Sequence, residues 1–174
     1  MSSTLPDLVD PWRAVDTGAA YAGSLPLSRF PRLRDSLWSS GGEAAFRLRF
    51  SRDSEHRGVV HGEVRARLQL VCQRCMEPLN RDVDASFELA LVRGLDEARG
   101  LPERYDPLMV SAEPIRPAEL IEDELLLALP QIPMHLSGEC KPQLPRENGA
   151  EEVRRSSETH PFAALADWKS RSDP

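Results

Sequence analysis

The sequence has few cysteines, no long apolar run and no surplus of basic residues, and each absence argues against a class of protein. Three cysteines cannot all pair with one another, which argues against the disulfide framework of a small secreted domain. No apolar stretch approaches the ~18 residues of a membrane-spanning helix. The first residues, Met1–Asp7, show neither the basic nor the apolar region of a secretory signal. We therefore expect a cytoplasmic protein without a membrane segment.

The formal net charge is −6, whereas proteins that hold RNA by its phosphates usually carry a basic surplus. The charge is uneven along the chain. Residues 45–75 contain seven arginines against three acidic residues, and residues 101–130 contain seven acidic residues against two arginines. Such segments within one small domain can simply neutralise each other.

Three stretches alternate apolar and polar side chains, which is typical of β-strands with one covered face. They span residues 44–51, 63–72 and 82–91. Ala20–Leu25 and Leu108–Val110 are predicted as shorter strands. The pattern predicts an α+β fold, in which an antiparallel β meander packs against a few helices.

Helical spacing of apolar residues predicts a helix within Pro26–Trp38 and, more clearly, at Pro117–Leu129. Pro117 suits the first helical position, and acidic residues lie toward the positive end of that helix. Residues 1–13 are predicted to be an extended lead-in, and Arg93–Asp106 a polar loop.

Two short pairs of metal-ligand residues stand far apart in the sequence. Cys72 and Cys75 form a Cys-x2-Cys motif at the end of a predicted strand, and His135 and Cys140 form a His-x4-Cys motif after a segment with two prolines. Two such pairs are the ligand pattern of a tetrahedral structural zinc site. We expect a Cys/His knuckle in which Cys72, Cys75, His135 and Cys140 bind zinc and leave no coordination position open.

Two alternatives to zinc remain open. A redox Cys-x-x-Cys motif usually opens a helix, whose N-terminus lowers the thiol pKa, whereas this motif follows a strand and soon meets Pro78. The other alternative is three reduced thiols without a metal.

The polar faces of the predicted strands are complementary in charge, with arginines on the first two strands and Asp82, Asp84 and Glu88 on the third. One interpretation is cross-strand ion pairing on a solvated face, each pair contributing ~0.2–1 kcal/mol. The other is a basic patch that contacts RNA. The candidate RNA contacts are Arg47, Arg49, Arg65, Arg67 and Arg74.

The domain organisation is predicted in three parts. Residues 1–140 form a single α+β domain, residues 141–159 form a disordered linker, and residues 160–174 form a flexible C-terminal tail. The tail holds a short amphipathic segment, too short to be a stable helix alone. Its candidate partner-binding residues are Phe162, Leu165 and Trp168.

Nothing in the sequence indicates an enzyme, since it has no Gly-rich phosphate loop and no serine nucleophile elbow. A nuclease would need carboxylates that converge on Mg²⁺. Glu119, Glu122 and Asp123 are the candidates, but we expect them on a solvated helix face.

Three blocks of the sequence resemble the bacterial YceD family, the large ribosomal RNA subunit accumulation proteins. The first is Leu70–Leu79, around Cys-Gln-Arg-Cys. The second is Leu120–His135, which contains Glu-Asp-Glu-Leu-Leu-Leu-Ala-Leu-Pro and is followed by Cys140. The third is His160–Lys169.

The resemblance implies a role in the synthesis, processing or accumulation of large-subunit (23S) ribosomal RNA, and hence in ribosome biogenesis. Pre-ribosomal RNA or ribosome-assembly proteins would be the partners, with no small-molecule substrate. The resemblance brings no catalytic residue with it, and the zinc ligands are an interpretation of this sequence alone. The alternative functions are a zinc-stapled adaptor for protein interactions and an RNA-processing nuclease.

Overall fold

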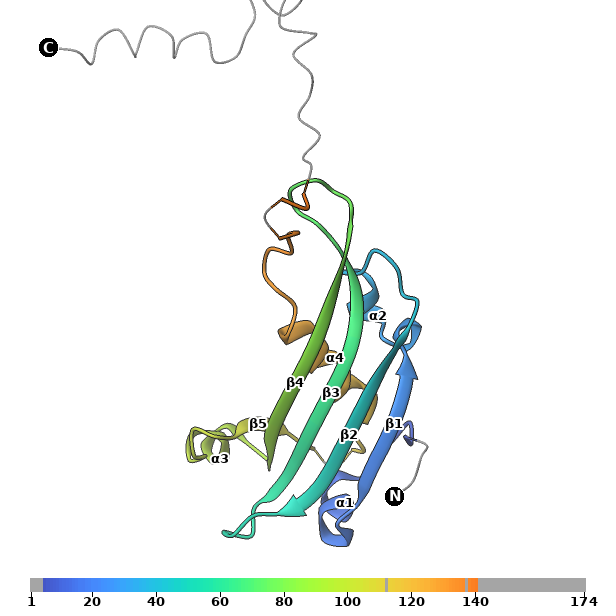
Figure 1. Cartoon of the computed structure of the whole chain (residues 1–174). Coiled ribbons are helices and arrows are strands. Elements are labelled where there is room, and N and C mark those ends of the chain that lie inside the picture. The colour runs from blue at the N-terminus through green and yellow to red at the C-terminus, as the bar shows by residue number, and fades with distance from the viewer. Residues whose placement is uncertain (1–4, 112, 137, 141–174) are drawn as a thin grey trace, which may run out of the picture. The chain divides into compact units, whose positions relative to one another are not determined.

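The computed structural model describes residues 5–111, 113–136 and 138–140, which form an α+β fold (Figure 1). The strands are β1 (Ala20–Pro26), β2 (Glu43–Arg52), β3 (Gly58–Val71), β4 (Pro78–Val92) and β5 (Asp106–Met109). They form one sheet in the order β1-β2-β3-β4-β5. The first four are an antiparallel meander, and β5 pairs with β4 in parallel. The predicted fold class is therefore confirmed, with a sheet that is mixed at one edge.

The three long strands follow the predicted alternation. On β2 every second residue from Ala44 to Phe50 is at most 4% exposed, and the residues between them, including Arg47 and Arg49, are exposed. Phe46 lies opposite Val64 on β3, which lies opposite Ala85 on β4. Because directly opposed residues point to the same side of a sheet, the apolar faces coincide. The core forms on that face.

A glycine marks the centre of the core face. Gly62 of β3 pairs with Leu48 on one side and with Phe87 on the other. A Cβ atom at Gly62 would lie 1.9 Å from Cζ of Phe87. The Phe87 ring therefore fills the space that any larger residue at position 62 would need.

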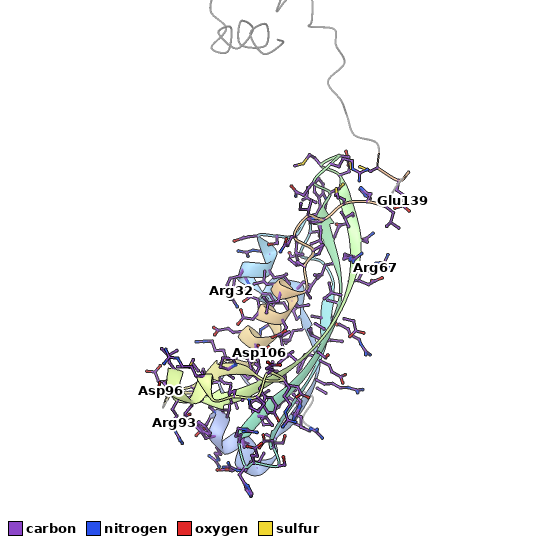
Figure 2. The ribbon with its side chains drawn as sticks, turned by 90° about the vertical axis from the view of Figure 1, so that its left-hand side faces the viewer. Arg32, Arg67, Arg93, Asp96, Asp106 and Glu139 are labelled. Carbon is purple, nitrogen blue, oxygen red and sulfur yellow. The ribbon has the colours of Figure 1, made fainter. Side chains whose placement is uncertain are left out.

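The helices are α1 (Pro11–Thr17), the 3₁₀ turn η1 (Leu27–Arg29), α2 (Pro31–Arg34), α3 (Leu95–Arg99) and α4 (Pro117–Leu127). Figures 1 and 2 show α1, α2 and α4 against one face of the sheet. From α4, Leu120, Ile121 and Leu125 enter the core. None of the described helices has the length and apolar character needed to cross a membrane.

The prediction of an extended lead-in over residues 1–13 is wrong for its last three residues, which begin α1. The Asp10 carboxylate accepts hydrogen bonds from the backbone N–H groups of Trp12 and Arg13, at 3.0 and 3.1 Å. Pro11 holds the first helical position. Gly18, with φ of 62°, ends the helix in the left-handed conformation.

Two other predicted segments differ in their helical content. Within Pro26–Trp38 the chain forms η1 and α2 instead of one helix, because the residue before Pro31 is pushed into extended backbone. Leu27, Phe30 and Leu33 are nevertheless buried in the core, whereas Trp38 at the end of the segment is 52% exposed. The predicted loop Arg93–Asp106 contains α3. The long helix α4 ends at Leu127, two residues earlier than predicted.

A small second cluster lies on the other face of the sheet, at the end where α3 precedes β5. Val59 and Ala90 alternate with the core residues of their strands, and both pack with Tyr105. The Tyr105 hydroxyl donates to Oδ2 of Asp53 at 3.3 Å, and Nε of Arg57 donates to the same oxygen at 2.9 Å. The Asp53 side chain is only 5% exposed, so this carboxylate organises the β2–β3 turn.

Candidate metal centre

The two predicted ligand pairs lie in two loops that follow β3 and α4. Cys72 and Cys75 occupy the turn between β3 and β4, and His135 and Cys140 lie in the segment beyond α4. Figure 1 shows this later segment rising beside the turn at one end of the long strands. Two pairs that are far apart in the sequence therefore meet.

The separations of the ligand atoms fit one tetrahedral metal ion. The Sγ atoms of Cys72 and Cys140 are 3.8 Å apart, and Sγ of Cys75 is 3.4 Å from Nδ1 of His135. One ligand atom from each of the four residues lies within 4.8 Å of all the others. Zinc at ~2.3 Å from sulfur and ~2.0 Å from nitrogen would separate two sulfurs by ~3.8 Å, and a sulfur from a nitrogen by ~3.5 Å. The four residues are therefore placed to hold a metal.

A contact at Nε2 of His135 fixes the orientation of the imidazole ring, and hence the direction of Nδ1. Nε2 lies 3.2 Å from the carbonyl oxygen of Pro78. A carbonyl oxygen can only accept a hydrogen bond, so Nε2 is the protonated nitrogen of this contact. The lone pair of Nδ1 then faces Cys75. Metal-binding histidines usually donate their other N–H in this way, to a carbonyl or a carboxylate.

Backbone hydrogen bonds shape the turn and join the two loops. The N–H of Cys72 donates to the carbonyl of Glu77, and the N–H of Met76 donates to the carbonyl of Cys72, both at 2.9 Å. Met76 has a φ of 60°, which is uncommon for a residue other than glycine. The N–H of Gln73 donates to the carbonyl of Pro133 at 2.8 Å. The site is therefore held by main-chain contacts as well as by its ligand side chains.

The thiols differ in acidity. Burial opposes the charged form of Cys72, but backbone N–H groups, that of His135 foremost, lower the pKa of its thiol to about 5. Burial, together with hydrogen bonds to the neighbouring thiols, raises the pKa of Cys140 to about 11. A thiolate thus lies beside a protonated thiol. A bound cation would favour loss of the second proton.

The structure also bears on the redox alternative. The Cys-x-x-Cys motif lies in a turn between two strands and does not open a helix. Cys72 faces Cys140 rather than standing in an isolated pair with Cys75, and all three cysteines are free. The low pKa of Cys72 arises from N–H groups of the two loops. This arrangement favours a ligand cluster over a helix-opening redox pair.

The five candidate RNA contacts fall into three groups. Nε of Arg65 lies 3.0 Å from Oδ2 of Asp84, and Nε of Arg67 lies 3.9 Å from Oδ1 of Asp82. Figure 2 shows Arg67 on the side of the sheet away from the helices. Cross-strand ion pairing is thus present for two of the arginines.

The other three arginines form no ion pair among the described residues. Arg47 and Arg49 are exposed on β2. A guanidinium nitrogen of Arg74 lies 3.7 Å from Sδ of Met134, beside the metal ligands. Arg47 and Arg65 line one hollow on the exposed face of β2 and β3, so four of the five arginines share that face, and Arg74 lies apart from them beside Met134.

The carboxylates considered for a nuclease have separate roles. Glu119 and Asp123 are about half exposed or more, with side-chain exposures of 61% and 49%. Glu122 was expected on the solvated face, and this prediction is wrong, because its side chain is 3% exposed. It accepts hydrogen bonds from the backbone N–H groups of Arg32 and Leu33. Its lone pairs are occupied by the protein itself.

Some features of the site have no signal, or only a weak one, in the sequence. The Pro78 carbonyl that orients His135 is a backbone atom, which no residue type marks. The two loops that carry the candidate ligands, after β3 and after α4 (the metal-site loops), also expose apolar side chains, those of Met76, Ile132, Met134 and Leu136. The predicted linker and the tail residues Phe162, Leu165 and Trp168 lie outside the described residues.

Comparison with known proteins gives a consistent match. The family model "Large ribosomal RNA subunit accumulation protein YceD" matches residues 60–169, a span that includes all four candidate ligands. The chain is 32% identical to the protein of that name from Haemophilus influenzae. The match extends over 169 residues, which are 96% of this chain and 97% of the relative. No solved structure matches the chain. The chain belongs to the YceD family.

Proposed function

We propose that this protein is a non-enzymatic ribosome-biogenesis factor that promotes the accumulation of large-subunit (23S) ribosomal RNA in the cytoplasm. The accumulation role is the one named for its relative. The observation that carries the non-enzymatic assignment is the convergence of four protein ligands within 4.8 Å of one another. Four ligands complete the tetrahedral shell of zinc, which is the arrangement of structural sites. Catalytic zinc sites keep one position open for water or substrate.

Zinc is the metal that this ligand set favours. Three thiols and one imidazole are soft or borderline ligands, and tetrahedral sites of this composition are typical of structural zinc. Bound zinc would hold the two loops together at the end of the sheet. Main-chain contacts position the ligands. The Pro78 carbonyl orients His135, and the Gln73–Pro133 hydrogen bond aligns the two loops.

A protein contact is the mode of action that the surface supports best. The metal-site loops expose four apolar side chains within a few residues of the candidate ligands, and exposed apolar residues that gather in one region are typical of interaction sites. The ribosome-assembly machinery would supply the partner. Direct contact with pre-ribosomal RNA is the second candidate, and it is favoured because Arg47 and Arg49 are exposed and form no ion pair among the described residues, although Glu63 lies opposite Arg47.

The decisive experiment is complementation in a strain that lacks this protein, with the ratio of 23S to 16S ribosomal RNA as the measurement. The wild-type gene should restore the ratio. Cys72→Ser and Cys140→Ser should fail to restore it, because the loops separate without metal. The double variant Glu119→Ala/Asp123→Ala should restore it fully. Loss of function in this carboxylate variant, at normal protein level, would favour a nuclease instead.

A further inference from the structure

β1 is an edge strand whose outer side pairs with no strand among the described residues. The sheet order ends at β1, and Figure 1 shows it as the last strand on that side. An open edge offers backbone N–H and C=O groups with which another chain can extend the sheet.

The register shows which groups face outward. The N–H of Phe50 on β2 donates to the carbonyl of Ala19 at 2.9 Å. In an antiparallel ladder, the N–H and C=O groups of every second residue bond to the neighbouring strand. The same groups of the residues in between point away from that strand. Ala19 bonds to β2, so the alternate residues that follow it direct their N–H and C=O groups to the open edge. These residues are Ala20, Ala22 and Ser24.

β1 lacks the features that usually protect an edge. It contains no charged residue, and its one proline, Pro26, is its last residue. The opposite edge differs, because β5 has only four residues and begins with Asp106 and Pro107. Short strands, charges and prolines are devices that prevent edge pairing. One edge of the sheet is protected and the other is open.

Two arginines on the neighbouring strand β2 determine which charge an added strand should carry. Arg49 lies opposite Ala20, and Arg47 lies opposite Ala22. All four side chains point to the exposed face, and the alanines are too small to block the arginines from the open edge. Neither arginine forms an ion pair among the described residues. A strand added beyond β1 would place every second side chain on this face, with the same two-residue spacing.

We propose that the β1 edge binds an extended, acidic segment of a partner protein, which adds a strand to the sheet and places alternate carboxylates near Arg47 and Arg49. This inference rests on the proposed function only in that the protein acts by contact. A second copy of the chain would bring its own uncharged β1 to the edge and no carboxylates. An RNA strand would supply phosphates to the arginines but no N–H groups to the ladder.

The test uses the full chain as purified and fluorescence anisotropy with defined probes. The first probe is a blocked ten-residue peptide of alternating Thr and Glu, and the second is the same peptide with Lys in place of Glu. The third is a single-stranded RNA of ten nucleotides. We expect saturable binding of the acidic peptide alone. An acidic peptide that fails to bind, or that binds no better than the basic one, would overturn the proposal.

Three variants separate the backbone contribution from the charge contribution. Ala22→Pro removes an outward N–H without removing a bond to β2, and should weaken acidic-peptide binding by about tenfold. Arg47→Glu/Arg49→Glu should abolish it. Arg34→Glu/Arg81→Glu makes the same change in net charge at exposed arginines outside this face and should bind like the wild type. Equal weakening by both double variants would indicate only a net-charge effect and would refute the site.

An acidic peptide methylated on alternate backbone nitrogens tests strand pairing without changing the protein. It should bind at least tenfold more weakly when the methylated N–H groups face β1. Unchanged affinity would refute sheet extension, even if Ala22→Pro fails to fold. RNA binding that depends on Arg47 and Arg49 but not on Ala22 would overturn the proposal in favour of an RNA contact. Zinc content and the ribosomal RNA ratio are measured separately, so failure here is distinguishable from failure of the proposed function.

Discussion

Oε1 of Glu122 lies 2.7 Å from the backbone nitrogen of Arg32, which joins α4 to the first turn of α2. The same oxygen accepts the N–H of Leu33 at 3.0 Å, and Oε2 faces the Arg32 guanidinium. The N-cap residue of α2, Phe30, makes no capping side-chain bond. A carboxylate from another helix therefore satisfies the free N–H groups that a Ser or Asp cap would normally bind.

Replacing Glu122 by Ala should destabilise the domain by about 3 kcal/mol, because it leaves two N–H groups of α2 without their acceptor and removes one of the two carboxylates that pair with the Arg32 guanidinium. Urea unfolding measures the loss. Glu119→Ala, on the same helix but exposed, is the matched control and should change the free energy of unfolding by less than ~0.5 kcal/mol. Similar losses in the two variants would show that the Glu122 contacts contribute little.

Protein purified without added metal should contain about one zinc per chain. Cys72→Ser, Cys140→Ser and His135→Ala should each lose the metal and melt at a lower temperature, since binding of the ion stabilises only the folded chain. His56→Ala, at an exposed position in the β2–β3 turn, is the control for His135 and should keep the zinc. Elemental analysis and thermal melts provide the measurements. A metal-free wild type would leave the cluster as three reduced thiols.

Asp53 should make stability depend on pH under acidic conditions. Burial works against its charged form, but hydrogen bonds from the Arg57 and Glu55 N–H groups and from the Arg57 guanidinium hold the pKa of Asp53 below its ordinary value. The folded-state pKa is thus below the unfolded one. The contribution is therefore fully present above pH ~4 and is lost as the pH falls through the folded-state pKa.

The measurement for Asp53 is the difference in free energy of unfolding between the wild type and Asp53→Asn. This difference should stay constant from pH 7 to pH 5 and should shrink below pH ~4. A difference that grows on acidification would contradict the direction assigned to the Asp53 pKa.

Gly62→Ala should destabilise the domain by ~1–3 kcal/mol, because the added methyl group would overlap the Phe87 ring. The double variant Gly62→Ala/Phe87→Leu should lose less than the sum of the two single variants, which a double-mutant cycle measures. Gly94→Ala is the control, since no atom lies within 4 Å of a Cβ built there. Additive losses would show that the destabilisation by Gly62→Ala does not arise from the Phe87 ring.

The strands and the core could be predicted because their signal is local. Every second residue from Ala44 to Phe50 is apolar, and the buried face follows directly from that period of two. The short parallel strand β5 was found as a strand, but its direction could not be predicted. Direction depends on how the chain returns through α3, and no residue in Asp106–Met109 specifies this.

The helices show where local reasoning was incomplete. Both ends of α1 have local signals, because Asp10 and Pro11 mark its start and Gly18 marks its end, and the prediction of an extended lead-in does not use them. The burial of Glu122 was not readable, because its partners are about 90 residues away in the sequence. Charged residues on a helix are normally solvated, and only the tertiary position of α2 overrides that expectation.

The candidate ligands were identifiable from their spacing, whereas the geometry of the cluster was not. Cys-x2-Cys and His-x4-Cys each mark half of a site. The 3.8 Å separation of Cys72 and Cys140 depends on where β3 and α4 end in space, because the two loops begin there. Likewise, Arg65 and Arg67 could be predicted as either ion-paired or free for RNA, and only the cross-strand register with Asp84 and Asp82 distinguishes the two.

The two halves of the metal site are made at different times on the ribosome. Cys75 and His135 are 60 positions apart, and Cys72 and Cys140 are 68 apart. Translation produces β4, α3, β5 and α4 between the first ligand pair and the second. A nascent chain therefore carries only two thiol ligands until residue 140 has emerged. A completed metal site would mark a domain whose synthesis is finished, and a chain truncated within α4 could never acquire the stabilisation that a bound metal would provide.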